Sequence, residues 1–70
     1  LRSSDDSILI ESDRNILLSN IVDGNVRISG KDNTVVNLIF TKPTSRLILE
    51  GDAKESTVII GLPEDKIVRI

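Results

Sequence analysis

Residues 25–37 read NVRISGKDNTVVN, two short apolar segments on either side of a polar corner. In the first segment Val26 and Ile28 flank Arg27, an alternation of apolar and polar residues that is typical of a half-buried strand. Gly30 and the three polar residues after it favour a turn, and the β-branched residues that follow favour a second strand. We therefore expect this stretch to form two short strands joined by a corner.

The apolar pair at residues 26 and 28 recurs along the chain, with a similar spacing between one pair and the next. Its equivalents form a first set: Ile8/Ile10, Val26/Ile28, Leu47/Leu49 and Val68/Ile70. A second set follows at a comparable spacing: Ile16/Leu18, Val36/Leu38 and Val58/Ile60. Such self-similarity is the sequence signature of repeat proteins, whose equivalent strands stack and turn the same side chains toward the interior.

The repeat predicts an all-β fold, a β-solenoid (parallel β-helix-like) of about three to four coils of roughly 20 residues each. Equivalent strands would lie in parallel about 4.8 Å apart, with the apolar pairs of every coil facing one interior. The alternative is a small antiparallel β-sandwich or barrel, which the strand spacing also permits. We favour the solenoid because only this fold requires similar offsets between the pairs.

The chain length fits one domain. Residues 1–6 are expected to be a flexible polar lead-in, and residues 7–70 a single β-repeat domain. Within this domain we place the coils at residues 7–24, 25–44 and 45–65, followed by a partial coil at residues 66–70.

Composition excludes several classes of function. The 70 residues carry a formal net charge of −2 and include no His, Cys, Met, Trp or Tyr, with Phe40 as the single aromatic residue. Without His and Cys there is no Ser-His-Asp triad, thiolate nucleophile or Cys/His zinc site, so we expect no enzyme activity, no metal and no cofactor. One aromatic residue and an acidic balance argue against nucleic-acid binding, and the apolar runs are far shorter than the roughly 20 residues of a transmembrane helix. The absence of Cys leaves the cellular compartment unassigned.

Two segments resemble known β-helical proteins. The stretch from Asn25 to Asn37 resembles the rungs of right-handed β-helix proteins, and within it Ile28 to Val35 (ISGKDNTV) resembles the β-helical domains of cyclase-associated proteins and tubulin-folding cofactor C. More loosely, Glu50 to Gly61 is similar to fungal β-solenoid prion-forming segments, which carry a polar Gly-containing arc before a Val-x-Ile pair. The resemblance implies a stacked parallel fold and, for the first group, a protein-binding role in cytoskeletal regulation. It assigns no functional residue.

Apolar residues at outward positions are the strongest candidates for a binding surface. Four aliphatic residues lie between inward neighbours, so period-two geometry predicts that they point outward. Two arginines occupy equivalent positions in other coils. The interface candidates are Leu9, Leu17, Ile48, Ile59, Arg27 and Arg69. Either these residues form a protein–protein or self-association surface, or they lie in strands that are buried on both sides.

Three functions are compatible with the sequence. The first is a structural or self-assembling β-solenoid module, as in a fibre, spike or stacked oligomer, acting through contacts with itself or another protein. The second is a protein-binding domain of the cytoskeletal-regulator type. The third is the remnant of a carbohydrate-active β-helix, which ranks last because no convergent acid–base pair or aromatic subsite is visible.

Overall fold

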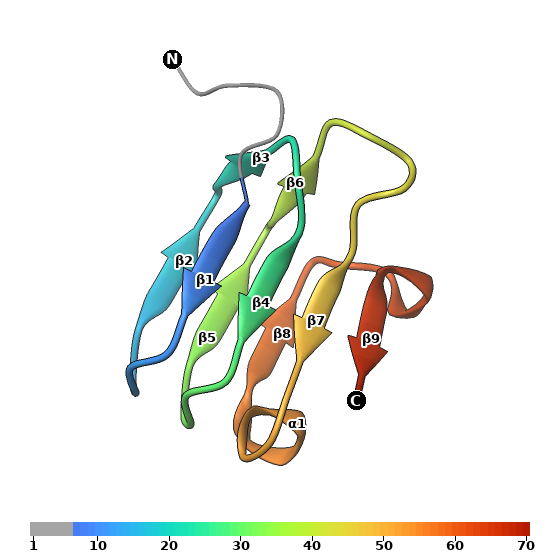
Figure 1. Cartoon of the computed structure of the whole chain (residues 1–70). Coiled ribbons are helices and arrows are strands. Elements are labelled where there is room, and N and C mark those ends of the chain that lie inside the picture. Colours follow the sequence, from blue (N-terminus) through green and yellow to red (C-terminus); the bar gives the residue numbers. More distant parts are fainter. Residues whose placement is uncertain (1–6) are drawn as a thin grey trace.

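The computed structural model describes residues 7–70, which form three parallel β-sheets (Figure 1). The lead-in expected at residues 1–6 lies outside the described residues. The first sheet has the strand order β1 (Ile8–Ile10), β4 (Val26–Ile28), β7 (Leu47–Leu49) and β9 (Ile67–Arg69). The second contains β2 (Ile16–Leu18), β5 (Thr34–Val36) and β8 (Val58–Ile60), and the third β3 (Ile21–Val22) and β6 (Ile39–Phe40). A short helix, α1 (Ala53–Ser56), lies between β7 and β8, and a 3₁₀ helix, η1 (Glu64–Lys66), lies between β8 and β9.

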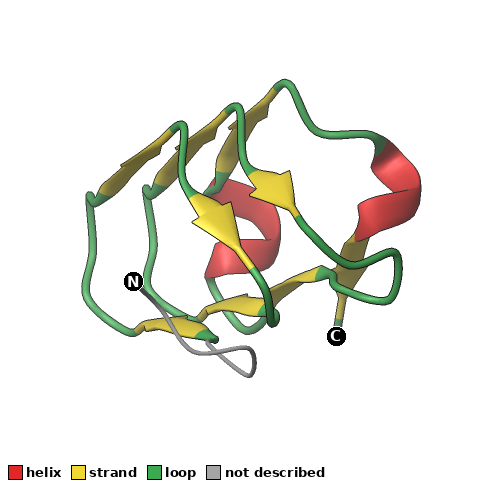
Figure 2. Cartoon of the chain, turned by 90° about the horizontal axis from the view of Figure 1, so that it is seen from above, coloured by secondary structure: helices red, strands yellow, loops and turns green. Residues whose placement is uncertain are grey.

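The chain passes through the sheets in a repeating order. The first unit comprises β1 to β3, the second unit β4 to β6, and the third unit β7 and β8, after which the chain returns to the first sheet as β9. Figure 2 shows the strands of successive units side by side. The predicted β-rich class is confirmed, with one small helix. Every strand pair in the described part of the chain is parallel, so the antiparallel alternative is wrong, and none of the sheets closes on itself.

The register shows that the units grow longer along the chain. The step, the number of residues between two paired positions of successive units, is the same in all three sheets from the first unit to the second. An example is the pair formed by Ile8 and Val26. The next step is longer in the first sheet, where Val26 pairs with Leu47, and longer still in the second, where Thr34 pairs with Val58. The additional residues lie in the connections at 41–46 and 50–57, the latter containing α1. The spacing predicted for the second set of pairs is therefore wrong.

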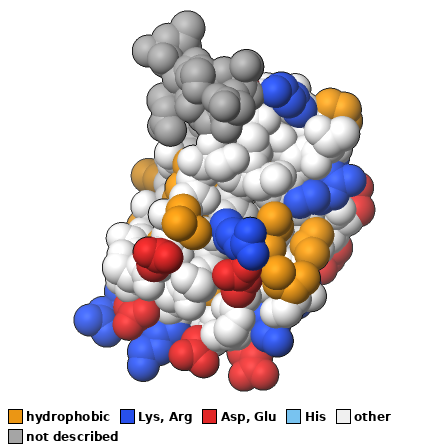
Figure 3. Space-filling model, viewed as in Figure 1, with side chains coloured by type: hydrophobic (Ala, Val, Ile, Leu, Met, Phe, Trp, Pro, Cys, Tyr) orange, Lys and Arg blue, Asp and Glu red, His pale blue; other side chains and the backbone are white. Residues whose placement is uncertain are grey.

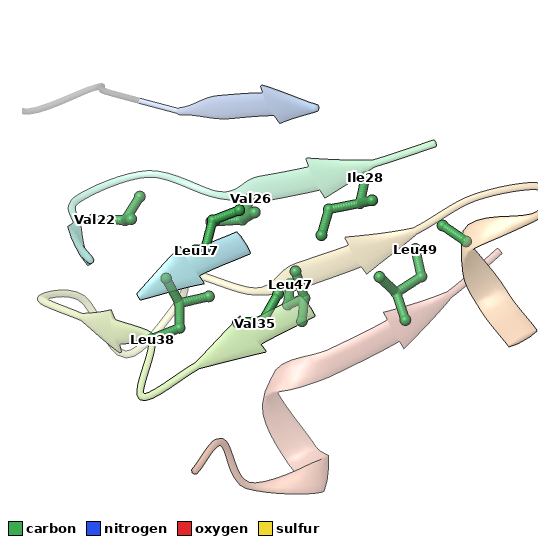
Figure 4. Close-up of a cluster of buried hydrophobic side chains, with 9 residues drawn as sticks. Leu17, Val22, Val26, Ile28, Val35, Leu38, Leu47 and Leu49 are labelled. Carbon is green, nitrogen blue, oxygen red and sulfur yellow. The ribbon is translucent and has the colours of Figure 1, made fainter. Parts of the chain in front are cut away.

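The core lies between the sheets and is entirely aliphatic (Figure 4). Val26, Ile28, Leu47 and Leu49 are at most 1 % exposed, as the alternation predicted. The remaining core side chains come from the second and third sheets and from the connections: Leu17, Val22, Val35, Leu38 and Ala53. Burial of a Val, Leu or Ile side chain stabilises a fold by about 1.5–3 kcal/mol, so this cluster is the main source of stability.

In the second sheet the inward and outward side chains are the reverse of those predicted. Leu17, expected on the surface, is only 7 % exposed, whereas its neighbours Ile16 and Leu18 are 70 % and 66 % exposed. Ile59, also expected to point outward, is half-buried and packs against the core. Successive side chains of a strand point to opposite faces of the sheet. An error of one residue in the alignment of the strands therefore exchanges the predicted inward and outward residues. The assignment of Ile16/Leu18 and Val58/Ile60 to the interior is therefore wrong.

The last strand is also shifted by one residue. Ile67 pairs with Leu47 and packs against the core, and Val68 pairs with Ile48. Val68 and Ile70 are 37 % and 57 % exposed, so their predicted burial is wrong. The connection at 61–66, which includes η1, brings residue 67 rather than residue 68 beside Leu47.

Candidate functional site

The outer side of the second sheet carries a continuous set of aliphatic side chains. Two rows of stacked residues run across β2, β5 and β8, and we call their six members the apolar face: Ile16, Thr34 and Val58 in one row, and Leu18, Val36 and Ile60 in the other. The residues of β2 and β8 are 52–70 % exposed, and those of the central strand β5 are half-buried. None of the six is charged, and Thr34 contributes the single hydroxyl group.

Exposed aliphatic residues continue beyond the bend that follows the second sheet. Ile21 and Ile39 pair in the third sheet and are 65 % and 49 % exposed. The bend is made at Ser19, Asn37 and Gly61, whose φ angles of 54°, 53° and 79° lie in the left-handed region. This backbone conformation turns the chain sharply after each strand of the second sheet and places two further isoleucines next to the apolar face.

The exposed apolar area is large for a protein of this size. At about 25 cal/mol per Å², full burial of an aliphatic side chain corresponds to roughly 60–120 Å². The six exposed aliphatic residues of the face and its extension therefore present roughly 200–430 Å² of apolar surface to water. That range overlaps the largest apolar patches of typical monomers, about 300–600 Å², although the total accessible surface here is only 4389 Å². The apolar face and its extension therefore make up a sizeable share of the accessible surface.

The outer side of the first sheet is different in character. Its central row stacks Leu9, Arg27, Ile48 and Val68 across β1, β4, β7 and β9. Arg27 forms an ion pair with Glu50, and the hydrogen bond and charge of this carboxylate raise the pKa of the guanidinium above its ordinary value. Figure 3 shows basic and acidic side chains interspersed with hydrophobic ones on this side. The outer side of the first sheet therefore carries charged side chains as well as exposed aliphatic ones such as Leu9 and Val68.

The structure separates the six predicted interface residues. Leu9, Arg27 and Arg69 are exposed, and Ile48 is half-buried in the outer row of the first sheet. Leu17 and Ile59 belong to the interior side of the second sheet and are not part of any surface patch. Arg69 lies in the last strand, β9, within 3.5 Å of the Glu64 carboxylate.

The sequence contains one signal that could have located the apolar face. Thr34 is the polar residue of β5, and its alternation with Val35 indicates that Val35 points inward. The separation between Ile8 and Val26, when it is used in the second sheet as well, aligns Ile16 with Thr34. Because Thr34 points outward, Ile16 then also lies on the outside. The prediction instead used a slightly longer step and aligned Ile16 with Val36.

The described residues offer no enclosed site. Within residues 7–70 there is no pocket and no group of three His, Cys, Asp or Glu side chains that could hold a metal ion. No helix in this part of the chain is long and apolar enough to cross a membrane. No protein family, curated protein or solved structure matches the chain.

Proposed function

We propose that this chain is a structural β-solenoid module that acts through protein–protein contacts and self-associates. The observation that carries the proposal is the apolar face, where Ile16, Leu18, Val58 and Ile60 are all more than half exposed and no charged residue lies among them. The parallel stacking of equivalent strands in the first and second sheets supports the solenoid architecture.

The energetics favour covering the face. On two copies the exposed aliphatic residues of the face and its extension amount to roughly 430–850 Å² of apolar surface. Removal of this surface from water favours association and offsets part of the translational and rotational freedom that association costs. We therefore expect self-association.

The ends of the sheets offer a second kind of contact. Among the described strands, β1 and β9 are the end strands of the first sheet, and β2 and β8 are those of the second. None of these strands contains proline, which would block further pairing. End-to-end stacking would extend the parallel sheets, whereas contact through the apolar face would not.

Light scattering coupled to size exclusion tests self-association over a concentration series. We expect the wild type to exceed the 7.7 kDa of one chain and the double variant Ile16→Lys/Ile60→Lys to elute as a folded monomer. The matched control is Leu9→Lys/Val68→Lys, which places two charges on the outer side of the first sheet and should leave the oligomer intact. A wild type that is folded and monomeric at high micromolar concentration would overturn the proposal.

A further inference from the structure

We infer that β9 is a stop at the end of the parallel stack, and that Arg69 prevents a second copy of this chain from continuing the first sheet. The inference goes beyond the proposed self-association, because it states which contact between copies the fold opposes. It does not involve the apolar face. It rests on the position that the strand register gives to Arg69.

Arg69 occupies an inward position of the first sheet. It pairs with Leu49, and the same row continues through Ile28 to Ile10. Ile28 and Leu49 are at most 1 % exposed and belong to the core. Period-two geometry also places Arg69 on the same side of β9 as Ile67, which packs against the core. The last strand of the sheet therefore carries a charge where the three other strands carry an aliphatic side chain.

The side chain of Arg69 nevertheless reaches water. Its Nη1 atom lies 3.5 Å from Oε1 of Glu64, which belongs to η1 just before β9. The two side chains are 46 % and 82 % exposed. A long basic side chain can extend from an inward position to solvent at the end of a sheet, where no further strand of the described residues covers it.

The lengths of the two larger sheets direct an approaching copy to β9 (Figure 1). The first sheet has four strands and the second has three, so β9 projects beyond β8 by one strand spacing, about 4.8 Å. In the first unit, by contrast, β1 and β2 are the first strands of their sheets. A copy that stacks its first unit on this end therefore meets β9 before it can reach β8. Pairing at β9 decides whether the stack continues.

Pairing at β9 would bury a charge. If β1 of a second copy continued the register, its Ile10 would lie over Arg69, just as Ile10 pairs with Ile28 within one chain. The guanidinium would then be enclosed between two aliphatic side chains and lose its access to water. Burial of an unpaired charge is costly, and inward-pointing charges on end strands oppose edge-to-edge pairing of β-sheets. Arg69 therefore opposes end-to-end growth, although β9 contains no proline.

Substitution of Arg69 tests the inference. Arg69→Leu and Arg69→Val make the inward side of β9 aliphatic, and we expect assemblies that bind thioflavin T and whose mass keeps rising with concentration. The wild type and Arg69→Lys, which keeps the charge, should reach a constant mass. Lys54→Leu is the matched control, because it also replaces a positive charge by an aliphatic side chain, but at an exposed position in α1. Light scattering over a concentration series measures the mass, and circular dichroism identifies the folded variants.

The outcomes separate this inference from the proposed function. Continued growth of the aliphatic Arg69 variants alone supports the stop at β9. Continued growth of the wild type, equal growth of Arg69→Leu and Lys54→Leu, or a constant mass of the folded aliphatic variants overturns it. A folded wild-type monomer overturns the proposed self-association, and the comparison of the Arg69 variants with Lys54→Leu still decides the role of Arg69.

Discussion

The side-chain oxygen of Asn33 accepts a hydrogen bond from the backbone N–H of Asn15 at 2.7 Å, and this contact joins the corners of the first and second units. The Asn33 amide nitrogen donates to the backbone oxygen of Ser12 at 3.2 Å. Asn33 is fully buried, so its polar atoms have no access to water. The stacking of the two units therefore depends on a buried polar side chain as well as on the aliphatic core.

Replacement of Asn33 tests this dependence. Asn33→Ala leaves the N–H of Asn15 and the carbonyl of Ser12 without their partner, so we expect the free energy of unfolding to fall by about 1–3 kcal/mol. The matched control is Asn20→Ala, at an exposed asparagine, which should change stability by less than about 0.5 kcal/mol. Urea denaturation measures both values, and equal effects of the two substitutions would contradict the assigned role of Asn33.

Gly30 allows the backbones of two corners to approach closely. A Cβ atom at this position would lie 2.1 Å from the backbone oxygen of Ser12, which cannot move without displacing the first unit. Gly30→Ala should therefore cost at least about 1–3 kcal/mol. At Gly51 a Cβ would meet no atom within 4 Å, and Gly51→Ala carries only the strain of a φ angle of +54°, about 1–2 kcal/mol. Thermal unfolding compares the two variants, and a larger loss at Gly51 than at Gly30 would contradict this account.

Substitution of two adjacent leucines tests which side of the second sheet packs against the core. Leu17→Ala removes a buried side chain and should lower stability by about 2–5 kcal/mol. Leu18→Ala removes an exposed one and should change the stability of the monomer by less than about 0.5 kcal/mol. Both variants are measured by denaturation at low concentration, where association does not contribute. The reverse order of the two effects would show that the sheet faces the other way.

The ion pair on the first sheet should contribute little. Arg27 and Glu50 are both accessible to solvent, so water and salt screen their attraction. We expect Glu50→Gln to lower the thermal midpoint only slightly at low ionic strength and not at all in 1 M salt. A loss that persists in 1 M salt would indicate that Glu50 has a structural role other than the ion pair.

The facing of a strand could be predicted where polar and apolar residues alternate. In β4, Arg27 lies between Val26 and Ile28, so the pattern itself identifies the inward side, and both valine and isoleucine are buried. In β2 the three residues Ile16, Leu17 and Leu18 are all apolar, and the pattern is compatible with either facing. The β-rich class and the burial of β4 were therefore predictable from the strands themselves. The facing of β2 required its alignment with Thr34 of β5.

Local pattern along the chain was enough to establish short strands, polar corners and a repeat, because strand periodicity and turn chemistry act between near neighbours. The register and the outer surface depended on contacts between units. The step from Thr34 to Val58 is longer than the step from Ile8 to Val26 because the connection at 41–46 and the corner containing α1 are both longer than their counterparts in the preceding unit, and a strand's own residues carry no record of these insertions. Packing of Leu17 and Val35 in the shared core leaves the opposite side of the second sheet exposed.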